Sequence, residues 1–426
     1  MAVVFINRFA WPDHSATSQL LSDLAAGLVA RGMRVTVVAS RLQYDDAQVR
    51  LPLHEVWKGV AFHRVQSSAL GRARLWRRAI DYLTFYLMLP AALCKVLGRG
   101  DVVVVKTDPP LLSLLVGAFA RWRGALLVNW LQDVFPEVAM RLRQPPVPVW
   151  LGFALQKLRN RSLRRAAMNV AIGQRMAETL RELGVADRRL QVVCNWAHED
   201  AIRPLPAARS ALRHRLRLDG QFVVGYSGNL GRAHDIDTLF DAAERLRDQE
   251  AIAFLVIGGG HGYQLLQERC RAASLGQVHF LPYQPIEALA DAMAAADLHL
   301  VSLLPSLEGL IVPSKFYGIA AAERPIGFVG DPDGELARLI AGNDCGFSVA
   351  WGDGAALARQ ILASAADPAR GRAQGQHARE LLERDFSRAA AHARWHDLLN
   401  ALTTAGPADK PHPSAVSHSA PPRIDS

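Results

Sequence analysis

The chain has 426 residues, 50% hydrophobic and 21% charged, a composition that excludes an intrinsically disordered protein and a length that favours two domains. The net charge is +9. The first 200 residues hold 27 Lys and Arg against 15 Asp and Glu, whereas the rest of the chain is slightly acidic, so the positive charge comes from the first half. The basic half predicts an anionic partner, which is either nucleic acid or an anionic membrane. The alternative is that its arginines are simply solvated on the surface.

The cysteines and the N-terminus bear on the compartment. Four cysteines lie far apart, without a C-x-x-C pair or a histidine at ligand spacing, which excludes a disulfide framework and a zinc site. The chain opens on a strand-like run and lacks the basic region, apolar core and cleavage site of a signal peptide. We therefore expect a cytoplasmic protein without a metal.

The first 40 residues have the pattern of a βα unit followed by a second strand. Residues 3–7 are a short apolar run of the buried type, a polar loop follows, and residues 19–31 form an amphipathic helix. Gly32 stops that helix before the strand at 34–39. This order opens a doubly wound sheet, and its loop lacks the G-x-G-x-x-G of a dinucleotide site.

Residues 70–98 predict a helix with arginines and aromatics at one end and a leucine-rich run. The uncharged portion, residues 82–94, is 13 residues long and contains Pro90, whereas a bilayer core requires about 20 residues. We therefore expect no transmembrane span here. The helix lies either in a membrane interface, where Arg and Trp are favoured, or in the core.

Two more strands of the buried type occupy residues 101–106 and 126–130, and two further strands, at 169–172 and 191–194, end the domain. Loops at the carboxyl ends of parallel strands are where ligands bind, and Asp133 lies in the loop after the second of these strands. Asp133 is therefore a candidate site residue. The alternative is an aspartate that only shapes a turn before the following proline.

A second β-then-α series follows a loop-rich, proline-containing hinge at residues 194–210. Its strands are expected at 222–226, 252–257, 278–281 and 298–303, with helices beginning at 238, 264, 287 and 314. We predict an N-terminal domain at 1–197 and a C-terminal domain at 198–400, whose final helices pack back across the hinge. The proline-rich tail, 405–426, should be disordered.

The segment 303–325 passes from a polar loop into a helix rich in small residues. Ser314 is a natural N-cap, and helix N-termini bind phosphate groups. Lys315 adds a mobile charge suited to a diphosphate, and Glu308 offers a hydrogen-bond acceptor to a sugar hydroxyl. The alternative is a plain cap beside a solvated lysine.

Gly228, Asn229, Leu230 and Gly231 follow a strand and precede a helix, so a ligand can approach the backbone there and Arg232 can reach its phosphates. The run GGGHG at 258–262 also follows a strand, but it lacks the rest of a nucleotide-binding fingerprint and favours a tight turn.

Five segments together resemble one known family. They are SATSQLLSDLAAGLVARGMRVTVV at 15–38, NWLQDVFPE at 129–137, VVCNWAHED at 192–200, YSGNLGRAHDIDTLFDAA at 226–243 and VPSKFYGIAAAERP at 312–325. In this order they resemble bacterial glycosyltransferases of the GT-B architecture, in particular family-four enzymes of exopolysaccharide assembly of the colanic-acid type. The resemblance covers about residues 1–400.

The resemblance implies two Rossmann-like α/β domains with a cleft between them and a glycosyltransferase of the hexosyltransferase type. A nucleotide-sugar donor would lie on the C-terminal domain, and a polyprenyl-pyrophosphate-linked glycan acceptor would reach the N-terminal domain at the cytoplasmic face of the inner membrane. No metal or organic cofactor is implied. The implied donor-binding residues are Gly228, Asn229, Gly231, Arg232, Ser314 and Lys315, the catalytic residues are Asp133 and Glu308, and the acceptor-binding residues are His14, Ser15 and Asp133.

The chain also departs from the family pattern. The family often has a second glutamate eight residues after the first, near the ribose, but here Phe316 stands eight residues after Glu308. If the alignment starts instead from Arg324 and Pro325 at the end of the helix, the position of the second glutamate falls on Gly318. Glu323 stands where the family usually has glycine. The ribose contacts are thus not predicted.

Two other functions stay open at this stage. A nucleotide-sugar epimerase can share the two-domain architecture, because fold alone does not fix function. A basic nucleic-acid-binding protein is the other, although no helix-turn-helix or aromatic-interleaved basic strand supports it.

Overall fold

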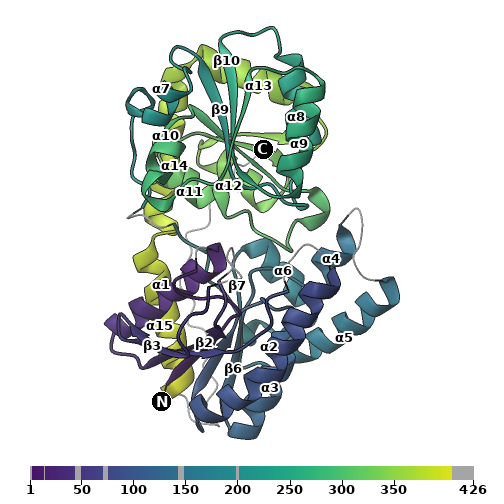
Figure 1. Ribbon diagram of the computed structural model, residues 1–426, viewed down its shortest axis with the longest axis vertical. Helices are drawn as coiled ribbons and strands as arrows, with labels where there is room; N and C mark the ends of the chain where they lie inside the picture. Colours follow the sequence, from purple (N-terminus) through teal and green to yellow (C-terminus); the bar gives the residue numbers. More distant parts are fainter. Residues whose placement is uncertain are drawn as a thin grey trace, which may run out of the picture.

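Two α/β units make up the protein, one above the other in Figure 1, and the last helix returns from the second to the first. The structure, a computed structural model, describes residues 2–13, 15–43, 49–70, 75–142, 148–197 and 201–404. The predicted fold class is confirmed, because both sheets are parallel and doubly wound apart from one edge hairpin. The predicted tail, 405–426, lies outside the described residues.

The first sheet has eight strands in the order β3-β4-β2-β1-β5-β6-β7-β8. They are β1 Val3–Ile6, β2 Val35–Ser40, β3 His54–Trp57, β4 Val60–Val65, β5 Val102–Val105, β6 Leu126–Trp130, β7 Met168–Ala171 and β8 Leu190–Val192. The helices of this unit are α1 Ala16–Ala30, α2 Leu75–Val96, α3 Leu112–Arg123, α4 Glu137–Arg141, α5 Val149–Arg165 and α6 Gln174–Glu182. Among the strands of this sheet, the two of the antiparallel β3–β4 hairpin were not predicted.

Helices cover both faces of this sheet, which is why its central strands are continuously apolar. Val102 and Val104 face a core that contains α1 and α15, whereas Val103 and Val105 face a core that contains α2 and α3. All four valines are buried, as a parallel sheet with two covered faces requires. Figure 1 shows α1 and α15 on one side of the sheet and α2 and α3 on the other.

The second sheet has six parallel strands in the order β11-β10-β9-β12-β13-β14. They are β9 Phe222–Asn229, β10 Ile252–Gly259, β11 Val278–Leu281, β12 Leu298–Ser302, β13 Ile326–Gly330 and β14 Gly346–Ala350. The helices are α7 Ala211–Arg215, α8 Asp237–Arg245, α9 His261–Ala272, α10 Leu289–Ala294, α11 Lys315–Ala321, α12 Glu335–Gly342, α13 Gly354–Ala366, α14 Pro368–Asp385 and α15 Arg388–Thr404. The first sheet ends at Val192 and the second begins at Phe222, so the hinge region lies between them.

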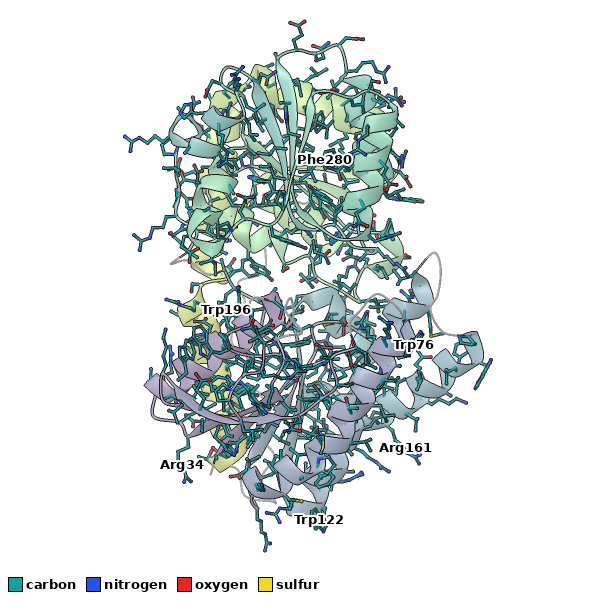
Figure 2. The ribbon with its side chains drawn as sticks, in the orientation of Figure 1. Arg34, Trp76, Trp122, Arg161, Trp196 and Phe280 are labelled. Atoms are coloured by element: carbon teal, nitrogen blue, oxygen red, sulfur yellow. The ribbon has the colours of Figure 1, made fainter. Side chains whose placement is uncertain are left out.

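Helix α15 fastens the end of the chain to the first unit. Trp395 is fully buried, with its ring centroid 4.8 Å from that of Trp130 at the end of β6. Trp196, at the hinge in Figure 2, stacks on the same Trp130 and donates a hydrogen bond from Nε1 to Asp23 Oδ2 in α1 at 2.7 Å. His392 of α15 lies 3.1 Å from that oxygen. The hinge, the first helix and the last helix therefore share one cluster.

Helix α2 is the one candidate for a membrane span among the described residues, because Trp76–Val96 is long and apolar enough by length and composition. It continues through Pro90, so it is longer than the uncharged run suggests. Phe85, Leu89 and Leu93 are fully buried against the first sheet. This side of the helix belongs to the core, whereas the opposite side is exposed.

The two units meet through loops at the carboxyl ends of their strands. Asp133, after β6, forms an antiparallel bridge with Ile311, after β12. Glu335, at the start of α12, accepts hydrogen bonds from the backbone N–H groups of Gln174 at 2.8 Å and Arg175 at 3.0 Å. These two N–H groups begin α6 of the other unit. A carboxylate of one domain thus caps a helix of the other.

Replacing Glu335 by alanine should loosen this contact. Loss of a helix cap costs about 1 kcal/mol, so amide hydrogen exchange at Gln174 and Arg175 should become about fivefold faster. Hydrogen exchange of the α6 peptide measures this, and Glu383→Ala, which removes an exposed carboxylate of α14, is the matched control. Unchanged exchange at α6 in Glu335→Ala would show that the cap does not hold the domains.

Candidate active site

The centre of the C-terminal half of the site is the amino group of Lys315. Its Nζ donates a hydrogen bond to Asn229 O at 2.8 Å and lies 3.0 Å from His234 Nε2. The ring centroid of Tyr226 is 5.1 Å from Nζ. Lys315 begins α11 and the other three belong to β9 or the loop after it, so the structure brings the predicted Gly228 loop and the predicted helix start together.

The tautomer of His234 explains why it accepts from the lysine. Its Nδ1 lies 2.6 Å from Ser302 O, and a carbonyl oxygen only accepts, so Nδ1 carries the proton and Nε2 accepts from Lys315. Burial, together with the charge of Lys315, lowers the pKa of His234 to about 3. The histidine is therefore neutral, and it orients the lysine without competing with it for an anion.

Lys315 is a cation held by neutral groups. Within the described ranges, its hydrogen-bond partners are a carbonyl and an imidazole, and no carboxylate pairs with it. Burial lowers the pKa of Lys315 to about 7. An ammonium has three N–H donors and two are used here, so one is available for an incoming anion. A phosphate at this place would restore the charged form of the lysine.

The Gly228 loop lies close to the next strand because side chains are missing there. Gly228 has φ +114°, and a Cβ on Gly258 would lie 2.1 Å from Gly228 O. The loop then opens on a cavity of about 240 Å³ lined by Gly231, Arg232 and His234, with Leu142 from the N-terminal half. Arg232 is exposed and lines this cavity, so a ligand in the cavity can reach it, and Asn229, at the end of β9, is also exposed.

Ser314 occupies the predicted N-cap position, but its side chain makes no capping hydrogen bond. Helix α11 is only 7 residues long. The predicted helix start is thus confirmed, whereas the predicted side-chain cap is wrong, because Ser314 has helical dihedral angles instead of the extended ones that a capping serine usually has. A role of Ser314 at the donor stays a prediction.

Glu308 follows a short 3₁₀ helix, Pro305–Leu307, and its carboxylate Oε1 accepts a hydrogen bond from Glu335 N at 2.8 Å. Burial raises the pKa of Glu308, while the hydrogen bond from Glu335 opposes that rise. In this structure Glu308 caps α12. Its predicted role at the donor sugar stays a prediction, which requires the side chain to turn away from α12.

Asp133 lies at the junction of the two halves, as its place after β6 requires. Its Oδ1 is buried without a hydrogen-bond partner in the described part of the chain, and its carboxylate accepts from the hydroxyl of Thr107. Burial raises the pKa of Asp133 to about 6, and the cation of Arg159 partly opposes that rise. A carboxyl with a pKa near neutral is suited to take up a proton.

A small cavity of about 30 Å³ lies behind Asp133 and is lined also by Lys106, Asn129 and Arg159. Arg159 forms an ion pair with Glu137, and its Nε and Nη1 have no partner among the described residues. Buried polar atoms of this kind are usually satisfied by a ligand or by water. The cavity behind Asp133 therefore holds a buried, partly unpaired guanidinium among mostly apolar side chains.

Ser15, another predicted acceptor residue, immediately precedes α1. Ser15 makes local contacts: its N–H donates to Asp13 Oδ1 at 2.8 Å, and its hydroxyl lies 2.8 Å from that of Ser18. The structure does not join Ser15 to Asp133. His14 lies outside the described residues.

The structure shows what Phe316 and Gly318 do at the two positions where the family's second glutamate was sought. Phe316 is buried, with its ring against those of Tyr317 and Phe386 at 5.4 and 5.6 Å, so it belongs to the core beside α14. A Cβ on Gly318 would meet Ile202 at 3.5 Å. Neither position supplies a carboxylate to a ribose.

Sequence reasoning missed four residues of the site, namely Tyr226, His234, Thr107 and Arg159. His234 follows Gly228 closely in the same loop, and that spacing was its only sequence signal. Arg159 lies in the middle of α5, far from Asp133 in sequence, and nothing in its surroundings distinguishes it from the other arginines of that helix.

Two family matches cover most of the chain. Residues 17–196 match the family described as Glycosyl transferase 4-like domain, and residues 221–367 match Glycosyl transferases group 1. The chain belongs to the family-four glycosyltransferases. The predicted resemblance is thereby confirmed, and the protein is a glycosyltransferase that uses nucleotide-sugar donors, related to enzymes of polysaccharide biosynthesis.

Two curated relatives and one solved structure are similar to this glycosyltransferase over most of its length. It is 29% identical to the probable glycosyltransferase WbjE of Pseudomonas aeruginosa, over 68% of this chain and 72% of the relative. It is 25% identical to the putative colanic acid biosynthesis glycosyl transferase WcaI of Escherichia coli K12, over 73% and 78%. The structure of Anabaena HepE in complex with UDP-glucose matches with a TM-score of 0.71 at 15% identity, covering 94% of this chain and 99% of that one. The GT-B fold is confirmed.

Proposed function

We propose that the enzyme transfers a hexose from a nucleotide-sugar donor to a polyprenyl-pyrophosphate-linked glycan in exopolysaccharide or capsule biosynthesis. In this proposal the chain is cytoplasmic and peripheral on the inner membrane, and it requires no metal or organic cofactor. The observation that carries the donor half is Lys315, a half-buried cation held by neutral acceptors beside the Gly228 loop. A diphosphate is the ligand that such a cation fits.

In the proposed mechanism, cationic side chains lie where negative charge develops during the reaction. As the bond between the sugar and the diphosphate breaks, negative charge grows on the leaving oxygens, and Lys315 and Arg232 stabilise it. The sugar passes through an oxocarbenium-like state while an acceptor hydroxyl approaches from the Asp133 side. Asp133 takes the proton of that hydroxyl if the configuration inverts; if it is retained, Asp133 orients the acceptor.

The relatives support the choice of substrates. WcaI is named for colanic acid biosynthesis, an exopolysaccharide, and HepE was solved with UDP-glucose. These names describe the relatives, and they make UDP-glucose the first donor to test here. The excess of Lys and Arg in the first 200 residues supports an anionic, pyrophosphate-linked acceptor.

A thermal-shift screen with UDP-, GDP-, ADP- and dTDP-sugars tests the donor. A ligand present at about 100 times its Kd stabilises the fold by about 2.7 kcal/mol, so one nucleotide should raise the melting temperature clearly above the others. Incubating that donor with and without a lipid-linked acceptor then separates the reactions. Product formation only with the acceptor supports transfer, whereas conversion of the sugar nucleotide alone would indicate an epimerase.

A further inference from the structure

The outer side of α2 carries a row of exposed apolar side chains, here called the α2 stripe: Trp76, Ile80, Leu83, Leu87 and Met88. Their exposed fractions are 53%, 38%, 56%, 68% and 45%. Residues spaced by three, four, seven and eleven lie on one side of a helix, so the first four form one continuous row and Met88 flanks it beside Leu87. An apolar row of this length on the surface of a protein usually marks a contact with a partner.

The inner side of the same helix fixes how the stripe is presented. Phe85, Leu89 and Leu93 are fully buried in the core of the first sheet. Asp81, one turn from the stripe, is buried and lies 3.6 Å from the guanidinium of Arg8. A helix anchored in this way cannot leave the domain to cross a bilayer, so the stripe offers a surface that lies flat against its partner.

The partner must also suit a second exposed row, on α5. Trp150 and Phe153 are exposed by 72% and 53%, and one to three turns further on Lys157, Arg161 and Arg164 are exposed. Trp76 of α2 and Arg161 of α5 lie on the same side of the N-terminal domain in Figure 2. Helix α3, which packs against both α2 and α5, ends on exposed Arg121 and Trp122. Exposed apolar groups and exposed cations therefore occur together on α2, α3 and α5.

We propose that the α2 stripe is the surface by which the enzyme docks on an anionic lipid bilayer. Tryptophan is favoured at the boundary between headgroups and acyl chains, leucine side chains insert below that boundary, and arginine and lysine meet the lipid phosphates. A second copy of this chain would bring the same cations against each other, because a two-fold interface pairs a surface with itself. The charge of this side thus favours lipid.

The cleft end of α2 connects this surface to the reaction. Arg78 Nε donates a hydrogen bond to the hydroxyl of Tyr82 at 2.7 Å, and the guanidinium of Arg8 lies 5.0 Å from the centroid of the Tyr82 ring. The charge of Arg78 also acts on Asp133. One helix therefore borders the bilayer on its outer side and the proposed acceptor site at its end. This part rests on the proposed function, since a lipid-linked acceptor would enter beside the stripe.

Vesicle flotation of the full-length enzyme tests the docking surface. The probes are vesicles of phosphatidylglycerol and phosphatidylcholine in equal parts, and vesicles of phosphatidylcholine alone. Leu83→Glu should lower binding to the anionic vesicles about tenfold, since it removes an exposed leucine that the bilayer would cover and adds a negative charge. Leu362→Glu changes an equally apolar side chain, exposed by 40% on α13 of the C-terminal domain, and should bind like the parent.

The outcomes separate docking from transfer. Both residues are on the surface, so both variants should melt like the parent, and transfer to a water-soluble acceptor should be unchanged because no bilayer is needed. Loss of flotation in Leu83→Glu alone supports the proposal. Equal flotation of Leu83→Glu and the parent overturns it, as does a parent dimer that Leu83→Glu converts to a monomer, which would assign the stripe to a second copy. Failure of the soluble transfer itself in the parent would count against the proposed function instead.

Discussion

Lys315→Ala should weaken the binding of a nucleoside diphosphate by at least about tenfold and leave the binding of the nucleoside nearly unchanged. A charge-assisted hydrogen bond to a phosphate contributes about 1.5 to 3 kcal/mol, and no other cation touches the carbonyl of Asn229 or the imidazole of His234 within the described contacts. Calorimetric titration of each variant with the nucleoside and its diphosphate measures both affinities. The comparison isolates the phosphate contact from the base contact.

Lys95→Ala is the matched control, because Lys95 is an exposed lysine at the end of α2 on the other domain. It should bind the diphosphate like the parent. If Lys315→Ala binds the diphosphate as tightly as the parent does, Lys315 is not part of the donor site, and the alternative of a plain cap beside a solvated lysine holds.

The pKa of Lys315 adds a pH dependence of known sign. Burial lowers this pKa to about 7, so in the free enzyme the ammonium form dominates below pH 7 and the neutral amine above it. A diphosphate binds the ammonium form, so its affinity should fall as pH rises from about 6 to about 8, by up to tenfold per unit above 7. In Lys315→Ala this fall should disappear.

The architecture was predictable because it depends on local pattern. The run VVVV of β5 is buried on both faces, and only a covered parallel sheet accommodates four consecutive valines of that kind. The β3–β4 hairpin escaped prediction because β3 is a four-residue edge strand with alternate residues exposed, too short to show a period. The position of Glu323 has a φ of +57°, a conformation that glycine adopts without strain, which is a local reason for glycine to be usual there.

The site was only partly predictable because it depends on contacts between distant segments. Lys315 and the Gly228 loop were recognised from their places after strands, but the link between them, His234, acts through its tautomer and a carbonyl on β12. Glu308 was expected to face a sugar, yet here it caps α12, whose start is 27 residues further along the chain. Helix α2 was expected either in the core or in a membrane interface, and the structure buries one side of it in the core and leaves the other side exposed.

Asp133→Asn should lower turnover by about 10² to 10⁴ with donor affinity nearly unchanged, because general acid–base catalysis contributes that much and the base touches the acceptor rather than the donor. Asparagine keeps the shape of the side chain and a carbonyl oxygen that accepts from Thr107. Transfer rate and donor affinity, measured on one preparation, test both statements. Asp187→Asn, which changes an exposed aspartate paired with Arg181, should keep the parental rate.

The pH profile provides an independent readout of the same residue. Burial raises the pKa of Asp133 to about 6, so the parent should lose activity as pH falls through about 6, when its carboxylate becomes protonated. The residual activity of Asp133→Asn should not show that fall. A variant whose rate falls with the same apparent pKa would assign the ionisation to another group.

Stability separates a base from a turn residue. A carboxyl whose pKa is higher in the folded than in the unfolded state binds its proton more tightly when folded, so its ionisation above about pH 6 works against the fold. Asparagine carries no charge, and at pH 7.5 the melting temperature of Asp133→Asn should therefore equal or exceed that of the parent. If Asp133 only shapes the turn before Pro136, the melting temperature should fall while the folded protein keeps its rate. An active, less stable Asp133→Asn would remove Asp133 from the mechanism and leave its bridge to Ile311 as its role.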